Sequence, residues 1–405
     1  MHRLGVAALA AAASVGVMAC ALLAGIEERT TSTAEAGLLD SGASIDSGAP
    51  TCNRPRWPNP PDVQPGGNAE DFNVAVRTFD LGFEVADSGD AEALAVFGYD
   101  LDCVDTCAPG PESCRVHGNA AEHCDEPNGG DNYAANLLQQ VGNLLPGAPS
   151  VNDFDFNAHI ASGDRGFVIQ LTGYNGAPNA TGFAVTVYAS SGIRRARDGG
   201  VNDGAAPFAP SWDGQDDWAL DPSSVADPDA GGLGGTPLFF DLNAYATNGV
   251  VVAHFAQMAI PVSLGVGTGV FIVDDATLTA NIVASDAGAA TLALAQGLIG
   301  ARIRTGTILS GLAQFTDPYT LTPLCGSNSS YQVVKPLICG SADINASSTH
   351  DNLGYGCNAL SVAIRFEAEP TATSNYVARV PETMAPGCTD AGVFRDDCDA
   401  DNGDY

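Results

Sequence analysis

The stretch that most constrains the fold runs from Gly166 to Gly192, where apolar side chains alternate with polar or small ones in two runs. The alternating residues are Phe167, Ile169 and Leu171 in the first run and Phe183, Val185 and Val187 in the second. Period-two alternation that is bounded by Gly, Asn and Pro is typical of half-buried antiparallel strands. We therefore expect a β-hairpin here and a mainly β fold around it.

Shorter runs with similar alternation recur on both sides of this hairpin. They span residues 72–81, 93–101, 239–246, 250–255, 260–264, 270–273, 276–283 and 360–366. Thr247-Asn248-Gly249 joins two of these runs and favours a tight hairpin turn. The sequence thus predicts a long series of antiparallel strands.

Helical patterns occur in two parts of the chain. An apolar stripe at helical spacing runs from Asn132 to Leu145, with Asp131 as a good N-cap and Pro146 at its end. Alanine- and leucine-rich stretches from about 285 to 345 favour short helices, including 308–315 and 331–338.

These patterns together predict a mainly β, antiparallel two-sheet sandwich of jelly-roll type, with one clear helix and a helical insertion before the last core strand. The expected organisation is a single β-sandwich domain over 51–385, with the helical insertion at about 285–345. An acidic, disulfide-bearing tail then occupies 386–405. A chain of 405 residues is long enough for such a core.

The amino terminus is typical of an export signal, because Arg3 precedes the apolar run Leu4–Ala19. The run ends at Cys20, and this junction resembles a bacterial lipoprotein signal. The resemblance implies a signal peptide at 1–19, acylation of Cys20 and a tether over 20–50. Because Ala21 rather than Asp follows the cysteine, it also implies the outer membrane or cell surface of a Gram-negative bacterium. Ordinary secretion with cleavage nearby is the alternative.

The net charge of the chain limits the kinds of molecule that it can bind. The chain has 48 acidic and 16 basic residues, for a net charge of −32. Such a chain repels phosphate backbones, and no basic stripe offsets this charge, so we expect no nucleic-acid partner. The expected membrane contact is through the lipid anchor.

The cysteines fit an oxidising compartment. Of eleven cysteines, acylation of Cys20 leaves ten, an even number that suits five disulfides. We expect Cys103, Cys107, Cys114 and Cys124 to pair among themselves, Cys388 to pair with Cys398, and Cys52, Cys325, Cys339 and Cys357 to form two more bridges. A zinc site of Cys114, His117, His123 and Cys124 is disfavoured, since adjacent residues make poor tetrahedral ligands.

Several short motifs together resemble a group of exported bacterial lipoproteins to which no activity is assigned. They are the Cys-rich loop after GYDLD, DNYAANLL, GYNGAPN, WDGQDDWALDP and CNALSVAIRFEA, and they span roughly residues 70 to 370. The resemblance supports a surface lipoprotein. It implies no reaction.

Two clusters are candidate binding sites. The first is aromatic: two tryptophans that flank a short acidic stretch could form a glycan-binding rim with the tip of the central hairpin. Ordinary packing of large aromatic residues is the alternative. The residues of this cluster are Trp212, Asp213, Asp216, Asp217, Trp218, Tyr174, Asn175 and Asn179. The rim requires the tryptophan loop and the hairpin tip to lie at the same end of the domain.

The second cluster is acidic and suits calcium, a hard cation that prefers oxygen ligands. Its residues are Asp100, Asp102, Asp125 and Asp131 around the Cys-rich loop, and Asp397, Asp399 and Asp401 in the tail. Solvated acidic loops, with Asp131 acting only as a helix cap, are the alternative. No other cofactor is expected.

Catalytic signatures are scarce. The sequence has no G-x-S-x-G, H-E-x-x-H or phosphate-loop motif. Glu367 and Glu369 share one face of the last strand and could form a carboxylate pair, but they point away from the apolar face. We therefore expect a non-enzymatic surface module that binds glycan or another envelope partner. An exported polysaccharide hydrolase and a purely structural envelope component are the alternatives.

Overall fold

In the computed structural model of the chain, only part of the backbone is described. The described residues are 56–63, 70–82, 97–104, 106, 113–116, 123–125, 129–137, 153–193, 209–227, 235–264, 267–285, 291–312, 322–351, 354–372, 376–378 and 396–398. The expected signal peptide, Cys20 and tether lie outside these residues, as does most of the acidic tail.

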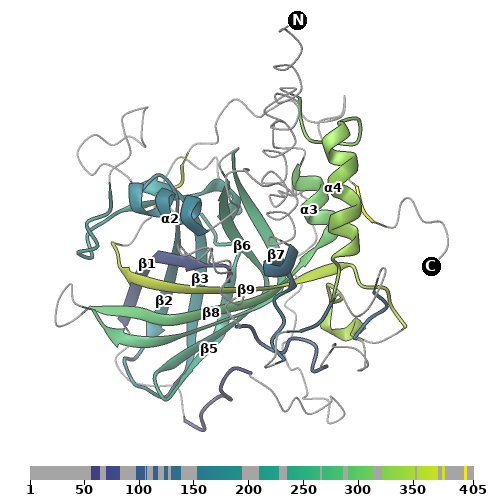
Figure 1. Cartoon of the computed structure of the whole chain (residues 1–405). Helices are drawn as coiled ribbons and strands as arrows, with labels where there is room; N and C mark the ends of the chain where they lie inside the picture. Colours follow the sequence, from purple (N-terminus) through teal and green to yellow (C-terminus); the bar gives the residue numbers. More distant parts are fainter. Residues whose placement is uncertain are drawn as a thin grey trace, which may run out of the picture.

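The fold is a closed antiparallel barrel of eight strands with one further strand outside it (Figure 1). The barrel strands are β1 (Glu70–Asp80), β2 (Gly166–Tyr174), β3 (Ala180–Ile193), β5 (Phe240–Thr247), β6 (Val250–Leu264), β7 (Gly267–Ala284), β8 (Leu292–Arg304) and β9 (Ala359–Pro370). Each pairs with the next along the barrel, and β9 pairs with β1 to close the circle. β4 (Trp218–Leu220) adds to β3 from the outside.

The expected two-sheet sandwich is therefore wrong. An alternating strand only reports that one of its faces is buried, and both a sandwich and a barrel satisfy that condition. What distinguishes them here is the pairing of β1 with β9, for example Phe79 with Phe366. These residues are far apart in the sequence, and nothing in the alternation encodes their contact.

The central hairpin is confirmed as β2 and β3, with Phe167 opposite Ala189 and Leu171 opposite Val185. The second expected hairpin is confirmed as β5 and β6. Asn248 and Gly249 have φ values of 53° and 84° in the turn between them, which the Asn-Gly pair accommodates with little strain.

Two local expectations are corrected. β8 lies in the stretch that was expected to be helical. Its inward-facing residues, such as Leu294 and Ile299, alternate with the others less clearly than those of β2, so the strand pattern is weak. Conversely, residues 97–101, expected to end a strand, form none and lie on the outer wall of β8.

The core fills the barrel with apolar side chains from every barrel strand. Its largest fully buried members include Phe167, Phe183, Ile169, Leu171 and Met258. Barrels of eight strands are just wide enough for side chains to fill them.

Three helices pack against this core at the end of the barrel where β2 begins and β8 ends. They are α2 (Asp153–Ser162), which was not expected, and α3 (Thr305–Leu312) and α4 (Ser329–Gly340), which match expected helices. Residues 133–137 of the predicted helix at 132–145 are also helical. Among the described residues, no helix is both long and apolar enough to cross a membrane.

Two disulfides of the described residues join segments that are distant in the sequence. Cys114 pairs with Cys357, and Cys339 pairs with Cys398. The expected pairing of all four cysteines within residues 103–124, the expected Cys388–Cys398 bridge, and the two bridges expected among Cys52, Cys325, Cys339 and Cys357 are therefore wrong. The reason is an isolated parallel β-bridge between Arg115 and Gly356, which places Cys114 next to Cys357. Cys103, Cys124 and Cys325 are disulfide-bonded as well, whereas Cys52, Cys107 and Cys388 lie outside the described residues.

Candidate functional site

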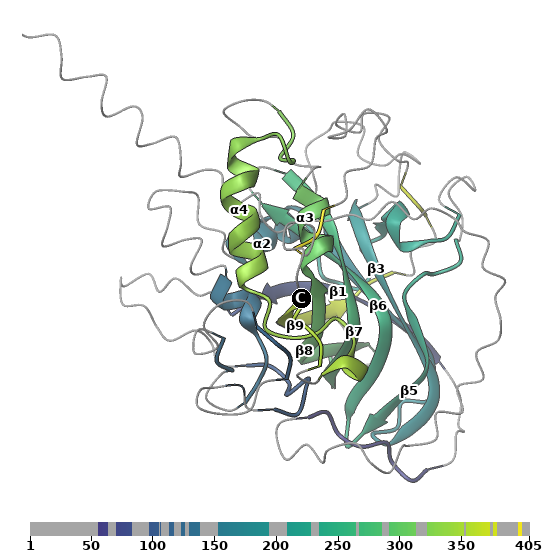
Figure 2. The same cartoon turned by 90° about the vertical axis from the view of Figure 1, so that its right-hand side faces the viewer.

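The main candidate site lies on the outer wall of β8 and β9, beneath segments that come from two distant parts of the chain. Residues 97–104 and 341–346 cover these strands through an apolar layer of Tyr99, Leu101, Ile344, Ala346 and Ala359. Both views show the blue segments around residues 97–137 beside the yellow-green loop that precedes β9 (Figure 1, Figure 2). The layer brings polar residues of both segments into a buried position.

A glycine pair fixes how closely two of the covering segments approach. A Cβ on Gly98 would lie 2.8 Å from the carbonyl oxygen of Asp131, and one on Gly130 would lie 2.9 Å from that of Gly98. The Asp131 N–H donates to the Tyr99 carbonyl at 2.9 Å. Only glycine permits this backbone contact, which places Asp131 beside the Asp100–Asp102 segment.

Three of the predicted calcium ligands are brought together by this contact. Carboxylate oxygens of Asp100, Asp102 and Asp131 all lie within 4.8 Å of one another. These residues are 1%, 7% and 2% exposed. An ion with oxygen ligands at about 2.3–2.6 Å holds opposite ligands up to about 5 Å apart, so the spacing fits a single ion such as calcium.

Hydrogen bonds from the backbone orient two of the three carboxylates. The Leu101 N–H donates to Asp131 Oδ2 at 2.6 Å, and the Val104 N–H donates to Asp102 Oδ1 at 2.8 Å. Burial raises the pKa of Asp102, and burial together with Asp102, Asp125 and Asp343 raises the pKa of Asp131 well above its usual range. Negative charge therefore accumulates here without full compensation from the protein.

Asp125, the fourth predicted ligand, lies at the edge of the same cluster. The Thr106 N–H donates to its Oδ2 at 2.9 Å, and the Thr106 hydroxyl donates to Oδ1. Burial raises the pKa of Asp125 to about 6, and the two hydrogen bonds from Thr106 partly offset this rise. The charge of Asp102 raises this pKa further, which is another sign of excess negative charge.

Asp343 is a further acid that the sequence did not single out. Ser361 of β9 donates to it twice, from its N–H to Oδ1 at 2.9 Å and from its hydroxyl to Oδ2 at 2.5 Å. Burial raises the pKa of Asp343 to about 7. Its signal in the sequence is weak, because an isolated Asp between Ala342 and Ile344 resembles an ordinary loop residue.

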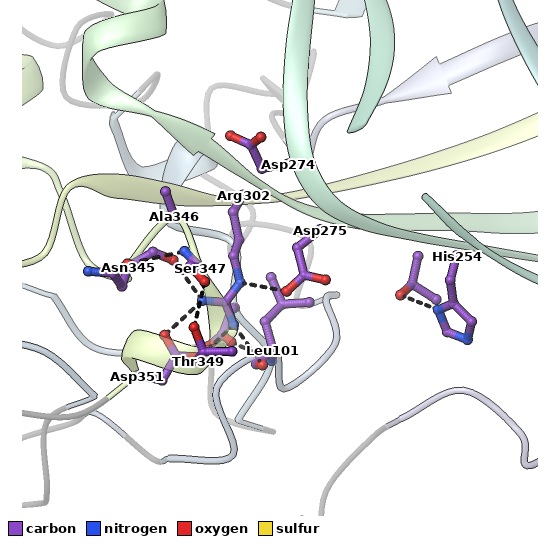
Figure 3. Close-up of polar contacts among 12 residues, drawn as sticks. Leu101, His254, Asp274, Asp275, Arg302, Asn345, Ala346, Ser347, Thr349 and Asp351 are labelled. Carbon is purple, nitrogen blue, oxygen red and sulfur yellow. Dashed lines mark hydrogen bonds and ion pairs between the residues drawn. The ribbon is translucent and has the colours of Figure 1, made fainter. Parts of the chain in front are cut away.

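Arg302 of β8 forms a second polar group, and Figure 3 shows its contacts. Its guanidinium donates to both carboxylate oxygens of Asp351 at 2.7 Å, to the Asn345 carbonyl at 2.6 Å and to the Leu101 carbonyl at 2.9 Å. Asp275 Oδ2 lies 3.7 Å from its Nε. Burial disfavours the charge of Arg302, but the hydrogen-bonded Asp351 outweighs it and raises the pKa.

Arg302 therefore ties both covering segments to the barrel. It holds the carbonyl of Leu101, which lies between two of the clustered aspartates in the sequence, and it holds the loop at 345–351. Its charge also acts on Asp102. Because the guanidinium of Arg302 is already paired with Asp351, Arg302 neutralises the negative charge of the aspartate cluster only in part.

The predicted glycan rim does not form. Trp218 is fully buried and packs directly against Gly166. A Cβ on Gly166 would lie only 2.6 Å from two carbons of the Trp218 ring. Trp218 pairs with Ile193, at the end of the hairpin away from its tip. The two halves of the rim therefore lie at opposite ends of β3.

The remaining rim residues have structural partners. Asp216 accepts from Ser211 and Trp212, and Asp213 accepts from Gln215. Trp212 is partly buried, with the guanidinium of Arg77 5.9 Å from its ring centre.

The hairpin tip is likewise committed to the fold. Tyr174 is 3% exposed and packs between Phe72 and Phe183. Asn175 and Asn179 accept hydrogen bonds from Ala177 and Asn248. These side chains serve the turns in which they lie.

The remaining predicted sites are the glutamate pair, the zinc set and the tail aspartates. Glu367 is exposed, and Glu369 lies 3.4 Å from Arg77 and accepts from Ser285. The disfavoured zinc set lacks free thiols, because Cys114 and Cys124 are disulfide-bonded. Of the tail aspartates, Asp397 is described, whereas Asp399 and Asp401 are outside the described residues.

Comparison with known proteins adds no relative. No protein-family model, curated protein or solved structure matches the chain.

Proposed function

We propose that this protein is an exported, lipid-anchored β-barrel that binds calcium at the cluster of Asp100, Asp102 and Asp131. The observation that carries the proposal is the approach of three buried carboxylates to within 4.8 Å of one another. Burying several like charges is unfavourable unless a cation or protons neutralise them. An ion at this point would also join residues 97–104 to residues 129–137.

Calcium fits these residues better than zinc or magnesium. Zinc prefers Cys and His, while magnesium demands a tight octahedron and retains its waters. Aspartates from two separate segments give the irregular oxygen set that calcium accepts. In the extracellular modules of other proteins, calcium sites have dissociation constants of about 10⁻⁴–10⁻³ M, which suits an exported chain.

Export and lipid anchoring rest on the signal at residues 1–20, and the disulfides are consistent with an oxidising compartment. We propose that the barrel acts without catalysis, as a surface-exposed module. A Cys20→Ser variant is expected to move from the membrane fraction to the soluble exported fraction. Unchanged membrane retention of that variant would remove the anchor from the proposal.

Thermal unfolding tests the calcium site. Calcium at about 100 times its dissociation constant should raise the stability by about 2.7 kcal/mol relative to chelator, a shift of several degrees. The shift should disappear in Asp100→Asn and in Asp131→Asn. It should remain in Asp227→Asn, which changes an exposed aspartate far from the cluster in sequence.

The outcomes separate the alternatives. A calcium shift that survives both cluster variants would assign binding to another place, such as the tail. No shift at calcium concentrations of tens of millimolar would favour a purely structural envelope component whose cluster is neutralised by protons.

A further inference from the structure

Residues 396–398, near the carboxy terminus, lie beside α4 and are drawn in yellow (Figure 1, Figure 2). The disulfide between Cys339 and Cys398 joins this segment to the end of α4. A Cβ on Gly306 of α3 would lie 3.3 Å from the carbonyl oxygen of Asp396, so the segment also approaches α3 closely. The segment therefore has a fixed place in the fold, although it comes long after the last barrel strand in the sequence.

This placement brings an amine and a carboxyl group together. Nζ of Lys335 on α4 lies 2.9 Å from Oδ1 of Asp396. The hydroxyl of Tyr331, one helical turn earlier, donates to Oδ2 at 2.5 Å, and the Asp397 N–H donates to Oδ1 at 2.8 Å. The side chains of Lys335 and Asp396 are only 12% and 16% exposed, and Tyr331 is 1% exposed. The carboxyl group is thus held in one orientation and is largely shielded from water.

The use of lysine at this position is exceptional in the chain. Lys335 is the only lysine among the 16 basic residues of the sequence. In the part of the chain that the structure describes, the other ion pairs of basic side chains with Asp or Glu that involve Lys or Arg all use arginine; their acids are Asp221, Asp274, Asp275, Asp351 and Glu369. Arginine also pairs better with a carboxylate, because its planar fork can bind both oxygens. What lysine offers instead is an amine that can act as a nucleophile.

We propose that the amine of Lys335 condenses with the carboxyl group of Asp396 and forms an amide cross-link between α4 and the carboxy-terminal segment. The proton that lies between Nζ and Oδ1 passes to Oδ1, which leaves a neutral amine facing a neutral carboxyl group. The nitrogen then attacks Cγ, and the C–N bond forms. The bond from Cγ to Oδ1 breaks, and Oδ1 leaves as water with a second proton from the nitrogen. The step consumes no oxidant and no other reactant.

The surroundings of the two groups favour this step. The Tyr331 hydroxyl already donates to Oδ2, so it is placed to stabilise the negative charge that develops on that oxygen during the attack. The disulfide keeps α4 and the segment together, and well-oriented groups in one molecule reach effective concentrations of about 10⁵–10⁸ M. A neutral amide also avoids the cost of keeping two charges away from water.

The cross-link would make the attachment of residues 396–398 permanent. A disulfide alone releases the segment when it is reduced, whereas an amide does not. The proposal rests on neither the calcium site nor the lipid anchor, so its failure would leave both unaffected.

Peptide mapping of the purified full chain tests the cross-link. Trypsin cleaves after arginine but not at a lysine that precedes proline, so it places Lys335 in fragment 305–365 and Asp396 in fragment 396–405. After reduction and alkylation of every cysteine, we expect these fragments as a single species that is lighter than their sum by one water. Recovery of the fragments only as separate species would overturn the proposal.

Two variants distinguish the cross-link from an ordinary ion pair. Lys335→Arg keeps the positive charge but cannot form this amide, so the linked species should be lost while the circular dichroism spectrum stays that of the parent. Tyr331→Phe removes the donor to Oδ2 and should slow the reaction by about 100-fold, measured as the linked fraction over time after refolding from inclusion bodies. A linked species in Lys335→Arg, or an unchanged rate in Tyr331→Phe, would contradict the mechanism.

Amine labelling gives a second measurement that needs no variant to fold. In the reduced, urea-unfolded parent, an amine reagent should leave Lys335 unmodified, because its nitrogen is already part of an amide. Since the chain has one lysine, no other ε-amine contributes to the signal. Complete labelling of Lys335 would overturn the proposal and leave the contact with Asp396 as an ion pair.

Discussion

The inside of the barrel and the outer wall of β8 and β9 are both buried, but they are held together by different forces. Inside, apolar side chains such as Phe167 and Met258 pack without directional bonds. On the outer wall, Arg302 and the three buried aspartates of the cluster each need a particular partner. Burial alone therefore does not reveal what a region contributes.

The difference is energetic. Each large apolar side chain in the interior contributes about 1.5–3 kcal/mol on burial. A buried ion pair gains little over an apolar pair, because removing both charges from water costs about as much as their attraction returns. The interior thus accounts for most of the stability, whereas the outer wall contains the proposed binding site.

The largest effect should come from the interior. Phe167→Ala is expected to lower the stability by about 4 kcal/mol, because it removes a fully buried ring and leaves a cavity. Urea unfolding measures the loss, with exposed Thr172→Ala on the same strand as the control. The calcium-dependent part of the stability should stay the same. A calcium response that is lost in Phe167→Ala would mean that the two regions are not separate.

The second effect concerns the buried arginine. Arg302→Gln is expected to cost about 3 kcal/mol, because it leaves the carboxylate of Asp351 buried without its charge partner. Arg304→Gln, two residues along the same strand, breaks an ion pair whose arginine is 53% exposed and should cost less than about 1 kcal/mol. Arg302→Gln combined with Asp351→Asn should recover part of the loss.

Equal losses in the two single arginine variants would contradict the view that burial makes Arg302 special. Full recovery in the double variant would instead show that the unpaired carboxylate accounts for the entire cost. Both comparisons use the same urea unfolding measurement.

A smaller effect should appear with pH in the presence of chelator. Burial raises the pKa of Asp343 to about 7, so its protonated form is favoured in the fold. The stability that it contributes is fully present below its unfolded pKa of 3.8 and is lost as the pH rises through about 7. We expect the stability to fall by roughly 2 kcal/mol from pH 5 to pH 8.

Asp343→Asn provides the matched control, because the amide oxygen still accepts the Ser361 N–H while the charge is gone. The decline from pH 5 to pH 8 should be smaller in this variant. A stability that rises with pH in chelator, in both proteins alike, would show that the buried acids do not control it.

Much of the barrel interior could be predicted from the sequence. Period-two alternation identified β2 and β3, and the Asn248-Gly249 turn identified the β5–β6 hairpin. The closure of the barrel was missed because the pairing of Phe79 with Phe366 is a long-range property. β8 was missed because its alanine- and glycine-rich sequence has little contrast between its two faces.

The outer wall was only partly predictable. Asp100, Asp102, Asp125 and Asp131 were identified because acidic residues flank the Cys-rich loop at short spacing. Asp343 and Arg302 were not, since they come from elements far along the chain and join the site only after folding. The prediction for the two tryptophans was wrong because the Trp218 ring packs against Gly166. No local sequence pattern indicates that contact.

Buried acids on the outer wall are proposed to hold a calcium ion. A crystal structure grown with millimolar calcium and recorded with anomalous data tests it most directly. We predict one anomalous peak at about 2.3–2.6 Å from oxygens of Asp100, Asp102 and Asp131. The same three carboxylates in contact with one another, with no peak between them, would contradict it.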